Sequence, residues 1–419
     1  MSRTLHVGID VGHHHHAVCL LDQTGTRLGR AFTVVNNQPG AADLIAHLVA
    51  QAPAFDEVQI GLEATGLYGW HLYRALARAP DLAPHRPRLV IFNPKTIHGF
   101  RDAYTAMDKT DPDDAFLIAE RLRFGRLPAA PPPDPRYFPL QRLTRYRFHL
   151  VHTLVRAKAQ ALTLLFLVAS EYDRRKPFTD PFGATSLAVL TELGSLDELA
   201  AMSLEDLSAF LDRHGHRQFA DPAALAQVLQ QVATDSFRLD DEAVAPLHFA
   251  LTHALAHIRF LMQQLAPLDR RIATELARFP NTLLTVPGIG PVFAAGLVAE
   301  IGDVTRFADD DALAKYAGLW WPRRQSGSFA ASDRPLSRAG NAYLRYYLCE
   351  AANSLRVHNE EYRRFYTRKY EETPKHPHKR ATVLTARKLV RLVHALLRTG
   401  QLYAGPGAVS PPKSRRRPG

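Results

Sequence analysis

The order of apolar and polar positions predicts an α/β unit in the first quarter of the chain. Residues 5–11 (LHVGIDV) alternate apolar and other residues, as a half-buried strand does. Four more short β-rich runs follow, AVCLLD, RAFTVVN, VQIGLEAT and RLVIFNP, and the helical stretches AADLIAHLVAQA and GWHLYRALARA separate the last three. Three strands followed by alternating helices and strands are typical of a mixed sheet, which we expect a helix beginning near Asp111 to close.

Beyond this unit the pattern changes to a helical period. The stretch RLPAAPPPDPRYFPL is too rich in proline for a helix or a central strand, so we interpret it as a linker. Two long amphipathic helices follow, able to pair within one chain or between two, and Pro267 is expected to kink or end the second. Their apolar positions recur at a spacing of three or four: Leu143, Leu150, Leu154, Ala157, Ala161 and Leu164, then Leu251, Leu255, Ile258, Met262 and Leu265.

Residues 175–245 between these helices are helical in pattern and carry no readable chemistry. We therefore expect an α/β domain at 1–125, a proline-rich linker at 126–140, a helical coiled-coil region at 141–278, a mostly helical C-terminal domain at 279–403 and a basic disordered tail at 404–419.

The charge distribution along the chain indicates a class of binding partner. Lys and Arg number 52 against 41 acids, a net charge of +11, and no acid follows Glu372 while 11 Lys and Arg do. This asymmetry favours contact with a polyanion, most simply nucleic acid; a solubilising basic tail is the alternative. We find no signal peptide, no apolar stretch near the roughly 20 residues that span a bilayer, and only two cysteines, so we expect a cytoplasmic protein with no membrane partner.

Four acids are candidate metal ligands. Asp10 lies in the first strand (GIDVG), where an unpaired carboxylate costs several kcal/mol to desolvate, and Glu63 ends the fourth strand (GLEATG). Asp111 and Asp114 share a face on the first turn of the closing helix (KTDPDDA). Four carboxylates converging on one or two Mg²⁺ ions, or Mn²⁺, suit phosphodiester chemistry.

Helix capping is the alternative for two of these acids. Asp111 before a proline is a good N-cap, and Asp114 then stands at the N3 position of a capping box. Capping does not explain Asp10 or Glu63. Asp113 and Asp108 are interpreted as solvated neighbours.

Two other motifs are weaker indications of a functional site. The histidines His13–His16 are interpreted as an exposed polar hairpin turn rather than a metal site, because four consecutive residues cannot all face one ion. VPGIGPVFAAGLVAEIG has the form of a helix-hairpin-helix, in which the turn at Gly288 and Gly290 can hold a DNA phosphate; a plain helical turn is equally consistent.

The segment WWPRRQSGSF contains a possible nucleophile. Ser326 lies beside Arg323 and Arg324, and a serine hydroxyl can attack a phosphodiester if cations stabilise the developing charge, although most Ser-Gly pairs are turns. In the last helix, a basic stripe of Arg380, Arg387, Arg391 and Arg398 opposes an apolar face of Ala386, Leu389, Val390, Val393 and Leu397.

Seven motifs occur in a specific order: GIDVG, GLEATG, KTDPDDA, VPGIGPVFAAGLVAEIGDVTRF, KYAGLWWPRRQSGSF, LSRAGNAYLRYYL and ARKLV. Together they resemble the DEDD-type insertion-sequence transposases, the serine-using, RNA-guided DNA recombinases of bacterial mobile elements. The resemblance covers nearly the whole chain. Two features depart from it: His13 stands where the family often has lysine, and the middle region is the least family-like.

The resemblance implies a RuvC-like (RNase H) N-terminal fold whose metal-binding acids match Asp10, Glu63, Asp111 and Asp114. It further implies a C-terminal transposase domain whose nucleophile matches Ser326, contacts to DNA through Gly288, Gly290, Arg323, Arg324, Arg338, Arg387 and Arg391, a structured guide RNA, and a homodimer or homotetramer. Three rivals remain: a RuvC-like nuclease that acts by hydrolysis, an actin-like or sugar-kinase-like ATPase, and a DNA-bridging protein without catalysis.

Overall fold

The computed structural model describes residues 3–63, 66–104, 108–127, 134–193, 195–216, 219–322, 325–326, 329–330, 335–337 and 339–405. The chain forms two compact units, one of Met1–Arg136 with Gly302–Ala312 and the other of Tyr137–Ile301 with Leu313–Gly419. The segment that returns to the first unit contains the 3₁₀ turn η5 (Val304–Arg306).

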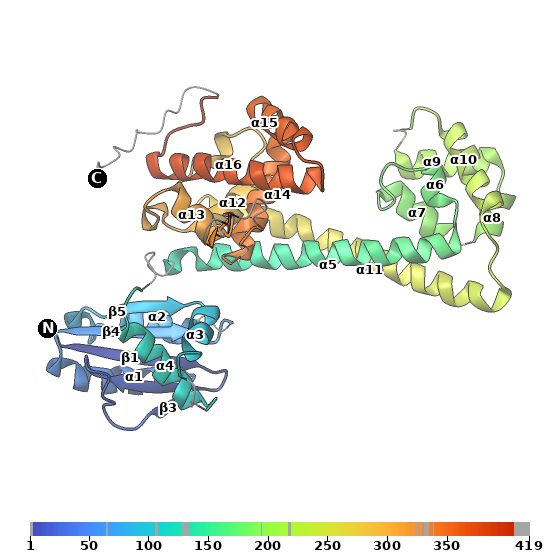
Figure 1. Ribbon diagram of the computed structural model, residues 1–419. Coiled ribbons are helices and arrows are strands. Elements are labelled where there is room, and N and C mark those ends of the chain that lie inside the picture. The colour runs from blue at the N-terminus through green and yellow to red at the C-terminus, as the bar shows by residue number, and fades with distance from the viewer. Residues whose placement is uncertain are drawn as a thin grey trace. The chain divides into compact units, whose positions relative to one another are not determined.

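The first unit is built on the predicted mixed sheet of five strands (Figure 1). The strands are β1 (Thr4–Val11), β2 (His15–Leu21), β3 (Phe32–Val35), β4 (Glu57–Glu63) and β5 (Arg88–Phe92), in the order β3-β2-β1-β4-β5. The first three are antiparallel neighbours, whereas β4 and β5 run parallel to β1. This arrangement confirms the mixed sheet that the apolar pattern predicts.

Helices cover both faces of this sheet. Side chains of α1 (Gln38–Gln51) and α2 (Trp70–Arg78) pack with Val7, Ile9 and Val18 of the strands, while α4 (Asp111–Arg123) packs on the other face through Ala115 and Ala119. The 3₁₀ turns η1 (Ala52–Ala54) and η2 (Ala83–His85) end the two connections back to the sheet. The helix α3 (Pro94–Arg101) was not predicted, although its signal is present: Asn93 accepts a hydrogen bond from the Lys95 N–H, and proline follows it.

In the second unit, two long helices, α5 (Phe138–Val168) and α11 (Asp241–Leu276), lie side by side as predicted (Figure 1). The expectation that Pro267 might end the second helix is wrong, because α11 continues through Pro246 and Pro267 to Leu276. Packing against α5 and α12 offsets the hydrogen bond that each proline cannot donate.

The α5 segment corrects one expectation. Pro135–Val168 is long and apolar enough, by length and composition, to cross a membrane, with a mean hydropathy of 1.3 over its most apolar window. Only 17% of that window is buried, and along its length α5 packs against α11.

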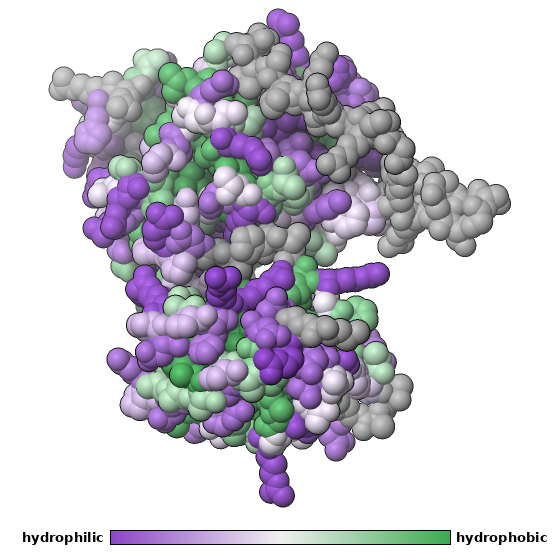
Figure 2. All heavy atoms as spheres, turned by 90° about the vertical axis from the view of Figure 1, so that its left-hand side faces the viewer, coloured by the Kyte–Doolittle hydropathy of each residue, from purple (hydrophilic) through white to green (hydrophobic). Residues whose placement is uncertain are grey.

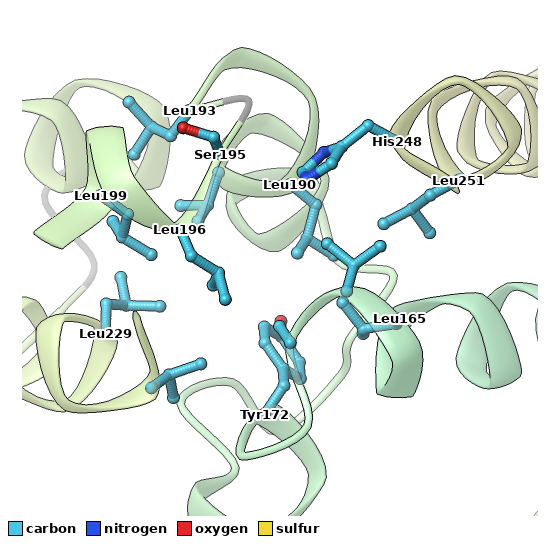
Figure 3. A pocket seen from close by; sticks show the side chains of 14 residues that line it. Leu165, Tyr172, Leu190, Leu193, Ser195, Leu196, Leu199, Leu229, His248 and Leu251 are labelled. Carbon is cyan, nitrogen blue, oxygen red and sulfur yellow. The ribbon is translucent and has the colours of Figure 1, made fainter. Parts of the chain in front are cut away.

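Five short helices enclose a core at one end of this pair. They are α6 (Tyr172–Arg175), α7 (Ala184–Glu192), α8 (Leu196–Ala201), α9 (Leu204–Gly215) and α10 (Pro222–Asp235). Leucine side chains, among them Leu196, Leu199 and Leu229, surround a cavity beside Tyr172 (Figure 3). Its volume of about 40 Å³ leaves room for little more than a water molecule, so it is no substrate site.

The remaining helices pack near the other ends of α5 and α11. They are α12 (Pro291–Ile301), α13 (Asp310–Ala317), α14 (Ala342–His358), α15 (Glu360–Glu371) and α16 (Pro377–Thr399), with the 3₁₀ turns η3 (Pro135–Tyr137) and η4 (Leu283–Thr285). The apolar face predicted for α16 is buried, except that Leu396 rather than Leu397 completes it. On the side drawn in Figure 2, hydrophilic side chains dominate the surface and apolar patches are scattered among them.

Candidate active site

Two of the predicted acids lie at the same end of neighbouring strands. In the parallel pair β1 and β4, Ile9 stands opposite Leu62, so the next residues, Asp10 and Glu63, come side by side at the carboxyl ends of both strands. Equivalent positions of parallel strands point to the same face of the sheet. The strand pattern alone therefore brings these two carboxylates together.

A glycine two residues before each acid sets the distance to the covering helix. A side chain at Gly8 would meet the carbonyl oxygen of Ala115 at 2.0 Å and the amide nitrogen of Ala119 at 2.4 Å. The α4 backbone therefore lies directly on β1, with contact distances that only glycine allows. Asp10 is two residues beyond Gly8 and so faces the same helix.

The helical period then brings the other two acids over the first two. Asp111 is one turn before Ala115, on the stripe of α4 that crosses Gly8, which aligns it with Asp10. Asp114 is one turn before Ile118, and a side chain at Gly61 would lie 3.0 Å from Ile118 Cγ2.

By the same argument the helical period directs Asp114 towards the side of Glu63, which is two residues beyond Gly61. Of the four carboxylates, Asp111 and Glu63 act on Asp10 at this edge of the sheet.

The electrostatics of Asp10 reflect this convergence. Burial, together with the neighbouring charges of Asp111 and Glu63, raises the pKa of the Asp10 carboxyl to about 6, although the Val11 N–H and Arg101 act in the opposite direction. A divalent cation would relieve the repulsion between these carboxylates. The hard oxygen donors fit Mg²⁺ or Mn²⁺ in kind.

The fourth acid is differently occupied. Asp114 forms an ion pair with Arg101 of α3, whose guanidinium also donates to the Asp108 carbonyl at 3.2 Å. Among the described residues, no three His, Cys, Asp or Glu side chains are arranged closely enough to hold a metal ion together. The carboxylates thus meet at one edge without closing around a common point, and Arg101 supplies a positive charge beside them.

The capping interpretation of Asp111 is wrong. The N-cap of α4 is Thr110, whose hydroxyl accepts from the Asp113 N–H at 3.4 Å and donates to the Asp113 carboxylate at 2.6 Å. Asp113, not Asp114, thus stands at the N3 position of a capping box, although its carboxylate accepts from the Thr110 hydroxyl rather than from the Thr110 N–H. Capping therefore does not account for Asp111 or Asp114. Asp113 is partly exposed and also holds the helix end.

The histidine run also differs from its interpretation. His13 and His14 are exposed in the turn after β1, but His15 and His16 belong to β2, and His16 is only 1% exposed. The strand period turns every second residue inward, and this buries a polar ring at the edge of the apolar core.

The segment around Ser326 is described by its backbone only. Gln325–Ser326 (β6) pairs antiparallel with Phe329–Ala330 (β7), with Ser326 opposite Phe329. The predicted neighbours Arg323, Arg324 and Arg338 lie outside the described residues, as does the Ser326 side chain. Its predicted role as nucleophile is therefore not tested.

A buried glutamate that sequence reasoning missed accepts hydrogen bonds from residues next to the segment that contains Ser326. Glu300 is fully buried in α12 and accepts from Arg145 at 2.6 and 2.8 Å, from Gln141 at 3.2 Å and from Asn341 at 2.7 Å. Asn341 in turn caps α14. The signal in the sequence is a lone acid within an apolar run, AAGLVAEIG.

Two backbone hydrogen bonds close the same segment. The Ser337 N–H donates to the Trp320 carbonyl at 3.0 Å, and the Asn341 N–H donates to the Tyr316 carbonyl at 2.7 Å. Both ends of the serine-bearing segment are thereby fixed to the network around Glu300.

The predicted nucleic-acid contacts lie on separate elements of the second unit. Gly288 has a left-handed backbone (φ +98°) and would place a side chain 3.2 Å from Leu355 Cα, and Gly290 immediately precedes α12. Arg387 is half-buried and Arg391 exposed on α16. The helix-hairpin-helix and the DNA contacts stay predictions.

Comparison with known proteins identifies the family. Residues 7–168 match the DEDD transposase model of the IS110 group, and residues 281–367 match the model of the IS116/IS110/IS902 transposase family; together these cover more than half of the chain. The first match contains all four acids and the second contains Ser326.

Relatives extend along nearly the full length. The chain is 28% identical to the insertion element IS116 uncharacterized 44.8 kDa protein of Streptomyces clavuligerus, over 95% of each chain. It is 26% identical to the insertion element IS900 uncharacterized 42 kDa protein of Mycobacterium paratuberculosis, over 96% of this chain and 98% of the relative. A pilin gene-inverting protein of Moraxella bovis is 21% identical over 96% and 98%. The chain belongs to the IS110 family of DEDD transposases.

Proposed function

We propose that this transposase excises and inserts its own element by metal-assisted strand cleavage and transfer, with Ser326 as the nucleophile. The observation that carries the proposal is that Asp111 and Glu63 lie close enough to Asp10, at the carboxyl ends of β1 and β4, to add to the effect of burial in raising its pKa. A clustered negative charge of this kind has no structural purpose in the sheet. It suits the binding of divalent cations and, through them, of DNA phosphates.

In this proposal Asp10, Glu63, Asp111 and Asp114 hold one or two Mg²⁺ or Mn²⁺ ions. When bound, such ions would supply Lewis-acid stabilisation of charge on the phosphate oxygens. Asp114 reaches this role only by leaving Arg101, so we expect the Arg101 guanidinium to be free to pair with a DNA phosphate when the site is loaded.

The covalent step follows from the chemistry of serine. The Ser326 hydroxyl oxygen attacks the phosphorus and loses its proton, while the bond from phosphorus to one deoxyribose oxygen breaks and that oxygen leaves as a protonated hydroxyl. The phosphoserine diester conserves the bond energy. A hydroxyl from the second DNA end then attacks the same phosphorus and regenerates Ser326, so no external energy source is needed.

Family resemblance supports three further parts of the proposal: a structured guide RNA that pairs with target and donor DNA, assembly as a homodimer or homotetramer with composite active sites, and the domain ranges given above. The pilin gene-inverting relative is consistent with a recombinase that joins DNA ends as well as cutting them.

The decisive experiment is a search for protein covalently attached to DNA. Purified protein is incubated with its element's end DNA, the flanking RNA transcript and Mg²⁺, then denatured and separated on a gel. We expect an adduct with the wild type and with Ser328→Ala, the matched control two residues away, but none with Ser326→Ala or Asp111→Ala. Cleavage without an adduct that survives Ser326→Ala would instead make this a hydrolytic nuclease.

A further inference from the structure

The first unit contains a second site, on the sheet face opposite α4. A cavity of about 430 Å³ lies between the start of β2, the end of β3, the start of α1 and one side of α2. His16 points to the same face of the sheet as Val18 and Leu20, which pack with α1 and α2. The alternate residues, Ala17 and Cys19, pack against α4 on the other face. The cavity is therefore separated from the four carboxylates by the thickness of the sheet.

His16 points to a ligand for this cavity. Its side chain lines the cavity and is 1% exposed, yet neither ring nitrogen has a hydrogen-bond partner of normal geometry among the described residues. Burial lowers the pKa of His16, and the nearby Asn36 side chain only partly opposes this, so the ring is neutral at pH 7 and offers one donor and one acceptor. Buried polar atoms without partners are costly, and a bound molecule would satisfy them.

The charged side chains that line the cavity are all positive. His71, Arg74 and Arg78 stand at a spacing of three or four on α2 and therefore present one face to the cavity. The described lining residues include no Asp or Glu. Two guanidinium groups one helical turn apart are suited to a phosphate, which accepts paired hydrogen bonds from arginine.

The polar rim is held in place by the backbone around it. The Asn36 amide donates to the carbonyls of His13 at 3.1 Å and Tyr68 at 3.1 Å, which joins the β1–β2 turn to the segment before α2. Asn37 caps α1 by accepting from the Gly40 N–H at 2.9 Å. The opening is thus pre-formed, as is usual for small-molecule sites of this size.

We propose that this cavity binds a nucleotide, with the phosphate held by Arg74 and Arg78 and the nucleoside placed against His16 and the amide side chains of the rim. A volume of about 430 Å³ exceeds what a phosphate alone fills and lies in the range of small-ligand pockets. The nucleotide is either free or the phosphorylated end of a nucleic-acid strand. The inference does not depend on Ser326 or on metal in the carboxylate site.

Calorimetric titration of the full-length protein in EDTA tests the proposal. The probes are a nucleoside 5′-monophosphate, the same nucleoside without phosphate, inorganic phosphate, and a 5′-phosphorylated trinucleotide. We expect the monophosphate to bind and both the nucleoside and inorganic phosphate to bind at least tenfold more weakly. Tighter binding of the trinucleotide than of the monophosphate identifies a strand end as the ligand; equal binding identifies a free nucleotide.

Variants locate the binding. The double variant Arg74→Ala, Arg78→Ala should bind the monophosphate at least tenfold more weakly, and His16→Leu should also bind it more weakly. Two control variants, Arg88→Ala on the exposed start of β5 and Asp10→Asn, should bind it with unchanged affinity. The double arginine variant keeps the proposal testable if His16→Leu fails to fold, because those two side chains are not buried. No monophosphate binding by the wild type, inorganic phosphate binding as tightly as the monophosphate, or full affinity in the double variant each overturns it.

Discussion

At Asp10, burial and two neighbouring carboxylates act in the same direction, and both disfavour the charged form. Because the pKa of about 6 in the folded protein lies above the ordinary value of 3.8, the folded chain keeps a proton at pH values where the unfolded chain has lost it. The contribution of Asp10 to stability is therefore fully present below about pH 4 and is lost as the pH rises through about 6.

The first prediction concerns this titration. Without metal, the Asp10 carboxyl should lower the free energy of unfolding by about 1–3 kcal/mol between pH 4 and pH 6. Asp10→Asn removes this contribution, so the variant should be more stable than the wild type at pH 7 and nearly equal at pH 4. Urea denaturation in EDTA measures the difference. The exposed Asp43→Asn serves as control, and parallel pH curves for wild type and Asp10→Asn would contradict the prediction.

Sequence patterns could predict that some of these acids are neighbours, but not their surroundings. The strand period and the helical period bring Asp10, Glu63 and Asp111 to one edge, whereas the role of the four acids as metal ligands stays a prediction. Arg101 could not be identified as the partner of Asp114, because α3 went unrecognised and the pairing depends on tertiary packing. The cap was misassigned since Thr110 and Asp111 are both good capping residues and only the backbone distinguishes them.

At the scale of elements, the contact between α4 and β1 depends on one glycine. In Gly8→Ala the new methyl group would collide with the α4 backbone at Ala115 and Ala119, which cannot yield as a flexible side chain would. We expect a loss of about 3 kcal/mol or more, together with displacement of Asp111 from Asp10. The melting temperature and the affinity for Mn²⁺ should fall together.

Gly99→Ala is the matched control for this change. It lies in α3, and nothing stands within 4 Å of the added methyl group. The change should be neutral or stabilise the protein by up to about 1 kcal/mol, since alanine is the better helix former. Equal effects of the two substitutions would exclude a steric role for Gly8.

A buried ion pair joins α5 and α12 of the second unit, and a hydrogen bond from Asn341 links it to the start of α14. Glu300 is fully buried and Arg145 mostly so, and removing one partner leaves an unpaired charge in the interior. Glu300→Ala should therefore cost about 3–5 kcal/mol in urea denaturation. Arg364→Ala breaks the exposed pair with Glu360 and should cost less than about 1 kcal/mol. A small effect of Glu300→Ala would mean that the network is not needed for stability.

Elements were predictable where the period was long and regular. The five strands, α1, α2 and the α5–α11 pair follow directly from apolar spacing. Pro267 does not end the helix, because local propensity was outweighed by packing along the 36 residues of α11, and the kink that was the other expectation stays a prediction. The role of His16 was missed because the run of four histidines concealed where the turn ends and the strand begins.

For the molecule as a whole, the charge distribution predicts how DNA binding responds to salt. The last residues, SPPKSRRRPG, contribute four of the cations that give the net charge of +11. The affinity for DNA should fall steeply with salt, and a chain ending at residue 405 should have a log–log slope smaller by up to about 4. Fluorescence anisotropy measures both slopes. The salt concentration is varied from about 50 to about 300 mM, roughly the range in which counterion release dominates binding. Identical slopes would exclude the tail from the interface.

The division of the chain also has a consequence for its synthesis. The first unit includes Gly302–Ala312, which the ribosome makes only after the 165 residues from Tyr137 to Ile301. At about 5–20 residues per second, roughly 8–33 s pass before the nascent N-terminal unit can acquire its last segment. During that interval the strands that carry Asp10 and Glu63 have been synthesised and Ser326 has not, so the segments with the proposed metal ligands and the proposed nucleophile mature at different times.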